Sequence, residues 1–152
     1  MDAKLLQLFE MLDSLDVTVE YCELGDDRDG DYCHEDRHLR VQHDLPFRRY
    51  RSTIGHETAH AVFGDAPSRF GPIRAKQERR ADEWAALRLI DLDDYREAER
   101  RHDGHIEAMA IALSVTVELV EAYQAVLLRV GDTVYVAPRM GAGQWQAKVR
   151  VA

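Results

Sequence analysis

The sequence predicts an α+β protein in which one helix carries a short histidine motif. Three observations support this class: apolar residues at helical spacing near the N-terminus, short segments of alternating polarity before residue 43, and an H-E-x-x-H motif in a proline-free stretch. We expect a small mixed or antiparallel sheet, the helix with the motif, a covering helical lobe and a C-terminal β-hairpin. The 152 residues fit one domain over residues 1–130, with the hairpin of residues 131–152 packed on it.

The first 42 residues predict one helix and three short strands. Leucines recur at helical spacing among acidic residues up to position 15, which indicates an amphipathic helix rather than a signal peptide. Residues 17–21 alternate apolar with polar side chains, and residues 32–34 and 38–42 predict two further strands around a polar turn. The acidic segment 25–31 lacks the glutamate that closes a calcium-binding loop, so we expect a solvated loop there.

The H-E-x-x-H motif consists of His56, Glu57 and His60. Two histidines four positions apart lie one turn apart on the same side of a helix, so both imidazoles can bind one ion. The intervening glutamate lies to the side, where it can accept a proton from metal-bound water. Residues 47–63 contain no proline, are followed by Gly64, and place their apolar stripe opposite the histidines. We therefore predict a zincin-type catalytic helix that packs on the core and turns its histidines toward a cleft.

A catalytic zinc ion needs a third protein ligand and one open position. Phe63 and Ala66 stand where a metzincin would have glycine and histidine, so that class is excluded. A following helical segment offers Glu78 and Asp82, one turn apart on the same face. We take Glu78 as the ligand and Asp82 as the acceptor of a histidine N–H, the usual second partner of a metal-bound imidazole. The spacing leaves the reverse assignment open.

Two blocks of the sequence resemble the ImmA/IrrE metallopeptidases. They are Arg51-x-x-Ile54-Gly55-His56-Glu57-x-x-His60 and Glu78-x-x-Ala81-Asp82-x-Trp84-Ala85-Ala86-x-x-Leu89-Ile90, with a weaker third match at 111–120. The resemblance covers roughly positions 38–123. It implies that His56, His60 and Glu78 bind one zinc ion per chain and that Glu57 is the catalytic base. Ile90-Asp91-Leu92 replaces the leucine-proline that often closes the second block, a departure that involves no ligand.

The resemblance also implies a substrate. Members of this family cleave a helix-turn-helix repressor and so derepress a phage, mobile-element or stress operon, and we expect a zinc metalloendopeptidase of this kind. One alternative is a zinc-binding, non-proteolytic regulator or antitoxin-like partner that displaces a repressor without cutting it. A zinc hydrolase acting on something other than protein is another. The oligomeric state is open.

Peptide hydrolysis also requires a donor for the tetrahedral intermediate and a place for the substrate backbone. Tyr50, His34, His38 and His43 are candidate donors that the sequence does not separate. In zinc peptidases, the strand before the catalytic helix is commonly a sheet edge that pairs with an extended substrate. We accordingly predict that Leu39, Arg40 and Val41 form this edge.

The C-terminal third predicts further helices and the hairpin. After a helix over residues 91–101, residues 106–127 show the helix, turn, helix pattern of some DNA-binding proteins, but the second helix, 117–128, has glutamates and no basic residue. We expect a helical hairpin packed against the catalytic helix and no direct nucleic-acid binding, in line with the net charge of −8. Residues 134–138 and 145–151 flank a glycine-containing turn and predict the terminal β-hairpin.

Hydropathy and cysteine spacing indicate the compartment. No apolar run approaches the roughly 20 residues that a membrane-spanning helix needs, so we expect a cytoplasmic protein without a membrane partner. The spacing of Cys22 and Cys33 fits no zinc knuckle, and we expect two reduced thiols in predicted strands. A disulfide between adjacent strands is the alternative.

Overall fold

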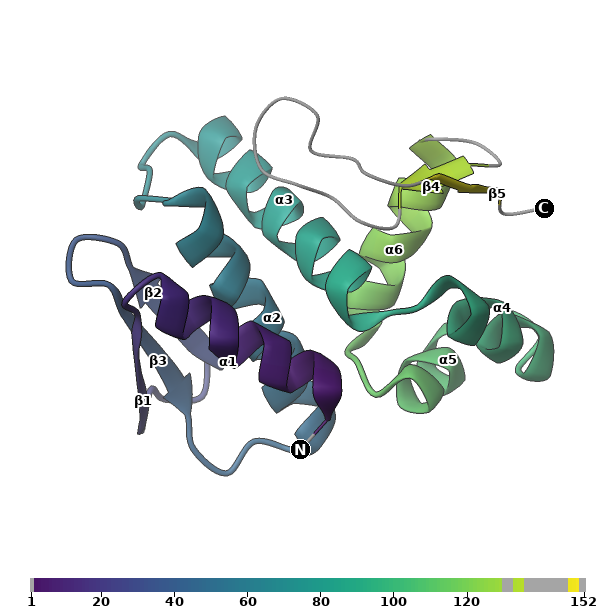
Figure 1. Ribbon diagram of the computed structural model, residues 1–152, viewed down its shortest axis with the longest axis horizontal. Helices are drawn as coiled ribbons and strands as arrows, with labels where there is room; N and C mark the ends of the chain where they lie inside the picture. The colour runs from purple at the N-terminus through teal and green to yellow at the C-terminus, as the bar shows by residue number, and fades with distance from the viewer. Residues whose placement is uncertain (1, 130–132, 136–147, 151–152) are drawn as a thin grey trace.

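A computed structural model describes residues 2–129, 133–135 and 148–150 of the chain (Figure 1). The α+β prediction is confirmed. In chain order the elements are α1 (Ala3–Ser14), β1 (Thr18–Cys22), β2 (Gly30–Cys33), β3 (His38–Gln42), α2 (Phe47–Phe63), α3 (Gly71–Leu89), α4 (Leu92–Arg101), α5 (Ile106–Leu113), α6 (Val117–Arg129), β4 (Thr133–Tyr135) and β5 (Lys148–Arg150).

The three-stranded sheet is mixed and has the order β1-β3-β2. β1 runs parallel to β3, and β2 runs antiparallel to it on the other side. β3 is therefore the central strand, and the prediction that Leu39, Arg40 and Val41 form an edge is wrong. Leu39 and Val41 are fully buried, and Arg40 pairs with Asp31 across the β2–β3 ladder. The sequence pattern locates strands but not their order, because order depends on which strand the chain returns to pair with.

The edge strand beside α2 is β2. Gly30 makes this approach possible, because a Cβ there would lie 2.6 Å from Cγ2 of Thr53 and 3.2 Å from Cγ of Glu57. Gln42 N–H donates to the carbonyl of Asp29 at 2.7 Å. Since hydrogen-bonded and non-bonded pairs alternate along an antiparallel ladder, Gly30 and Tyr32 direct their backbone groups away from β3, to the open side.

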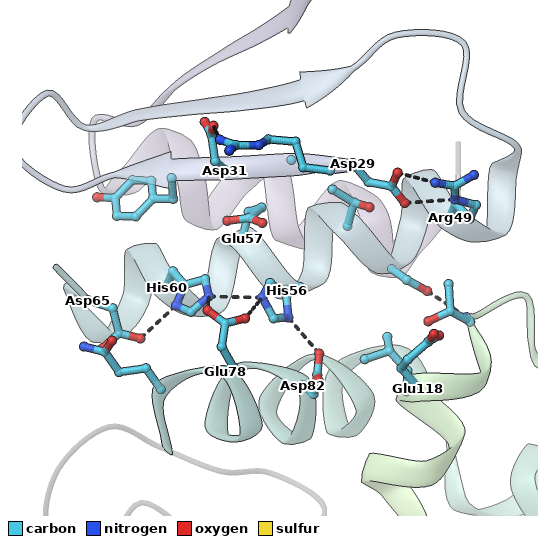
Figure 2. Close-up of a pocket in the computed structure, with 18 of the residues that line it drawn as sticks. Asp29, Asp31, Arg49, His56, Glu57, His60, Asp65, Glu78, Asp82 and Glu118 are labelled. Atoms are coloured by element: carbon cyan, nitrogen blue, oxygen red, sulfur yellow. Dashed lines mark hydrogen bonds and ion pairs between the residues drawn. The ribbon is translucent and has the colours of Figure 1, made fainter. Parts of the chain in front are cut away.

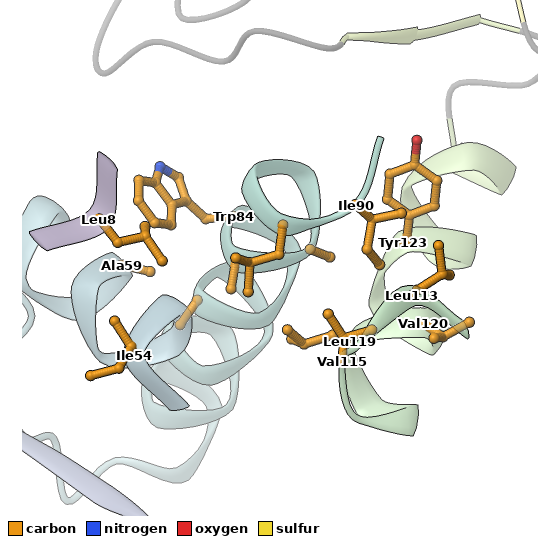
Figure 3. Packing of buried hydrophobic residues seen from close by; sticks show 14 of the residues in the cluster. Leu8, Ile54, Ala59, Trp84, Ile90, Leu113, Val115, Leu119, Val120 and Tyr123 are labelled. Carbon is orange, nitrogen blue, oxygen red and sulfur yellow. The ribbon is translucent and has the colours of Figure 1, made fainter. Parts of the chain in front are cut away.

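Helices α2 and α3 pack side by side at the centre of the molecule (Figures 1 and 3). Gly55 permits this contact: a Cβ there would lie 2.9 Å from Cδ1 of Leu89 and 3.2 Å from Cβ of Ala85. α1 covers α2 with its buried leucines, as its spacing predicts. The close α2–α3 contact brings the turn after Gly55, which holds the histidines, against α3.

Arg51 ties α2 to its neighbours. Its buried guanidinium donates hydrogen bonds to the side-chain carboxylate of Asp2 and to the carbonyl oxygens of Leu89, Leu113 and Ser114. These groups come from the start of α1, the end of α3 and the turn between α5 and α6. One side chain thus holds three segments of the chain against α2.

Helices α5 and α6 form a bent pair joined at Ser114, which has positive φ. α6 packs mainly on α3, with Leu119, Val120 and Tyr123 buried (Figure 3). The expected contact with the catalytic helix is made by the turn, where Thr116 N–H donates to Oγ of Ser52 at 2.9 Å.

Two further features relate to the sequence predictions. β4 and β5 pair antiparallel, while the predicted turn around residues 140–143 lies outside the described residues. Cys22 and Cys33 are free and lie on the two outer strands, with β3 between them. Within the described ranges, no helix taken singly has the length and apolar character to cross a membrane; α5 and α6 meet that test only together, across a bend of 102°.

Candidate metal centre

Three side chains from α2 and α3 direct their ligand atoms to one point (Figure 2). Nε2 of His56 lies 3.0 Å from Nε2 of His60 and 3.0 Å from Oε2 of Glu78, and Nε2 of His60 lies 3.3 Å from Oε1 of Glu78. Bonds of about 2.0–2.1 Å in a tetrahedral zinc site separate ligand atoms by roughly 3.3 Å. The donor set, two imidazoles and one carboxylate, therefore fits zinc in both chemistry and spacing.

A carboxylate contacts each histidine at Nδ1, the ring nitrogen that faces away from the three ligand atoms. Nδ1 of His56 lies 2.7 Å from Oδ1 of Asp82, and Nδ1 of His60 lies 2.9 Å from Oδ2 of Asp65. An Nδ1–H that donates to a carboxylate leaves the lone pair of Nε2 free for a metal. The structure thus places Asp82 behind a histidine and Glu78 among the ligand atoms.

Asp65 is the functional residue that sequence reasoning missed. It follows Gly64, whose positive φ of 64° ends α2 and turns the chain back. The available signal was an acidic residue directly after the helix-ending glycine, five positions past a ligand. Such a position is close enough to a histidine of the last turn to bond it, but only the cap geometry shows that it does.

Glu57 lies beside the three ligands under β2, and only 7% of it is exposed. Burial raises the pKa of its carboxyl group above the usual 4.5, although the neighbouring histidines oppose this rise. A buried carboxylate with a raised pKa is a stronger proton acceptor than an exposed one. This is the property that a general base requires.

The electrostatics of the site favour positive charge at the histidines. Burial lowers the pKa of His56, but the carboxylates of Asp82 and Glu78 outweigh it and raise the pKa to about 10. For His60, burial also lowers the pKa, and Glu78 and Asp65 raise it above 6.5. Hydrogen bonds from both histidines hold the pKa of Glu78 far below its usual range. An environment that stabilises a cation at this point is suited to a divalent metal.

An open cleft of about 1300 Å³ passes in front of these groups. β2 and the loop before it form one wall, α3 forms the other, and the ends are formed by the loop after α2 and the start of α6. Its lining includes Asp26, Asp27, Gly30, Asp31, Tyr32, His56, Glu57, His60, Asp65, Glu78, Asp82 and Glu118. The edge strand β2 contributes Gly30, Asp31 and Tyr32 to this lining.

None of the four candidate transition-state donors is among these lining residues. Tyr50 Oη bonds Tyr21 Oη at 2.9 Å, because this side of α2 faces the sheet. His38 Nε2 pairs with Glu20 at 2.8 Å, and His43 pairs with Asp44 and Glu23. The fourth, His34, packs against Gly64 and bonds Oη of Tyr32, a cleft residue, at 3.2 Å.

The family model Peptidase M78, described as the IrrE N-terminal-like domain, matches residues 12–123. The match spans most of the chain and contains all three ligands, Glu57 and both orienting carboxylates. Among curated proteins, none matches the chain significantly.

Proposed function

The chain belongs to the ImmA/IrrE family of metallopeptidases, and on that premise we propose that it is a zinc-dependent endopeptidase that cleaves a helix-turn-helix repressor. The observation that carries the zinc assignment is the convergence of His56, His60 and Glu78 within 3.3 Å of one another. Membership of a peptidase family supports the proposed peptidase activity. The substrate class follows the family's repressor-cleaving members, and the proposed reaction takes place in the cytoplasm, where such a repressor acts.

His56, His60 and Glu78 would hold the zinc ion. When bound, zinc would act as a Lewis acid that polarises the scissile carbonyl and lowers the pKa of the attacking water. Glu57 accepts the proton of the attacking water and delivers it to the nitrogen of the leaving amine. Its buried carboxyl, with a pKa raised by burial, is suited to both transfers.

The open side of β2 provides the place for the substrate backbone. Gly30 and Tyr32 direct their N–H and C=O groups to that side, and both residues line the cleft. An extended peptide that pairs with them lies across Glu57 and the ligands. Backbone pairing holds a peptide without reading its side chains, so specificity must come from the rest of the cleft.

Charge supports a basic protein as substrate. Nine carboxylates and four arginines line the cleft within the described residues, and the whole chain has a net charge of −8. Proteins that bind DNA carry clustered lysine and arginine. An acidic cleft therefore attracts a segment of such a repressor and repels the DNA itself.

The test is incubation of the purified protein with the repressor encoded beside it, with and without a chelator. We expect a shortened repressor fragment that is absent after chelation and absent with Glu57→Gln, a change that lowers hydrolysis by about 10²- to 10⁴-fold. Glu57→Gln leaves the ligands in place, so zinc content should be unchanged. Release of uncut repressor from DNA by the Glu57→Gln protein would instead identify a non-proteolytic regulator.

A further inference from the structure

The ligand Glu78 lies on the part of α3 that projects beyond the core. Residues 71–80 are exposed or half-exposed, and burial of the helix begins only at Ala81. The side chain of Glu78 itself is 51% exposed. Apolar packing therefore fixes the second half of α3, while the half with the ligand needs other contacts to hold it at α2.

Asp65 is held in place by the way α2 ends. Gly64 N–H donates to the carbonyl of Ala61 at 3.2 Å, and Asp65 N–H donates to that of His60 at 3.0 Å. These two bonds, with positive φ at Gly64, make a Schellman motif. The motif turns Asp65 back over the last helical turn, where its side chain is 8% exposed and bonds His60 Nδ1.

Arg80 joins Asp65 to the projecting half of α3. Its Nη2 donates to Oδ1 of Asp65, and its guanidinium lies 4.0 Å above the ring of Phe63. Its Nε is buried without a hydrogen-bond partner among the described residues, a cost that the ion pair and the ring contact must offset. Nearby, Gln77 donates to the carbonyl of Ala66 at 3.2 Å.

We propose that Asp65 and Arg80 act as positioning residues for the metal centre and form what we call the Asp65–Arg80 clamp. Oδ2 of Asp65 sets the tautomer and orientation of His60, while Oδ1 holds Arg80, two positions after Glu78. One buried carboxylate thus connects a ligand on α2 to the segment of α3 that carries another ligand. The inference rests on the proposed zinc centre and assigns to these two residues a share of its metal affinity.

The test is the dissociation constant for zinc, measured by competition with a chromogenic chelator on folded, metal-stripped protein. Asp65→Asn keeps the shape and removes the charge, and we expect it to weaken zinc binding by about 10- to 100-fold. Arg80→Met should weaken binding in the same direction. The double variant should weaken it by less than the product of the two single effects, because both changes break one connected unit.

Two variants provide matched controls. Arg79→Met changes the exposed neighbour of Arg80, and Asp13→Asn removes an exposed carboxylate on α1; both should bind zinc like the wild type. Circular dichroism of each metal-stripped variant separates loss of metal affinity from loss of fold. Wild-type zinc affinity in Asp65→Asn would overturn the clamp and leave the zinc centre intact, whereas a wild-type protein that binds no zinc would overturn the proposed function itself.

Discussion

Nδ1 of His56 on α2 lies 2.7 Å from Oδ1 of Asp82 on α3, so the helix that provides Glu78 also orients a histidine ligand. The contact crosses the interface that Gly55 brings close. We therefore expect metal affinity to depend on how α2 and α3 pack, as well as on the three proposed ligands themselves.

Asp82→Asn is expected to weaken zinc binding by about 10- to 100-fold without unfolding the protein. The amide can still accept a hydrogen bond from His56, but it no longer offers the negative charge that favours the metal-ligating tautomer. Chelator competition measures the change. Glu83→Gln is the control, because Glu83 pairs with Arg129 and contacts no ligand. Equal zinc affinity in the two variants would contradict the orienting role of Asp82.

Gly30→Ala is expected to destabilise the fold by about 1–3 kcal/mol and to impair hydrolysis. The added Cβ would lie 2.6 Å from Cγ2 of Thr53 and 3.2 Å from Cγ of Glu57, so β2 must move away from α2. Urea unfolding and peptidase assays measure the two effects. Gly71→Ala, where a Cβ meets nothing within 4 Å, should leave both properties near wild type. A fully active, equally stable Gly30→Ala protein would exclude this close approach.

Arg51→Met is expected to reduce the free energy of unfolding by about 3–5 kcal/mol. The change leaves Asp2 and the carbonyls of Leu89, Leu113 and Ser114 without their buried donor. Arg51→Lys should recover only part of the loss, since an ammonium cannot reproduce the planar guanidinium fork. Chemical denaturation monitored by tryptophan fluorescence measures the free energy of unfolding of the wild type and the two variants. Indistinguishable unfolding curves for the three proteins would contradict the tying role of Arg51.

Zinc binding at neutral pH is expected to release protons. Burial lowers the pKa of His56 in the metal-free protein, but the carboxylates of Asp82 and Glu78 raise it to about 10. Because the folded-state pKa of His56 is raised, protonation of His56 stabilises the folded, metal-free protein. This contribution is complete below the unfolded-state pKa of about 6.5 and is lost as the pH rises through 10. Zinc must displace this proton at pH 7, so its affinity should increase with pH.

Isothermal titration calorimetry at pH 7, in buffers of different ionisation enthalpy, measures the number of protons released. At least one proton per zinc is expected. A binding heat that is the same in every buffer would contradict the raised pKa of His56.

The local features of the site could be predicted from the sequence because they depend on spacing along one helix. His56, Glu57 and His60 have fixed positions relative to one another once α2 forms, and the same holds for Glu78 and Asp82 on α3. Spacing alone does not predict which face of α3 packs against α2, or which of Glu78 and Asp82 is the ligand. The family resemblance implied that Glu78 is the ligand.

The features that could not be predicted depend on chain reversal. Leu39 is central rather than peripheral because β3 lies between β1 and β2 and pairs in parallel with the earlier strand β1, and no residue pattern within 38–42 encodes that partner. Asp65 reaches His60 only through the Schellman motif at Gly64. Tyr50 and His38 were reasonable donors by residue type, but each faces another element and has a partner there.

We propose that His56, His60 and Glu78 hold one zinc ion and that peptide hydrolysis depends on this ion. The most direct measurement is the zinc content per chain, by elemental analysis, of the wild type and of Glu78→Gln purified side by side. Close to one zinc per wild-type chain is expected, with much less zinc in Glu78→Gln and a matching loss of repressor cleavage. A wild-type protein that contains no zinc and still cleaves its substrate would contradict zinc-dependent hydrolysis at this site.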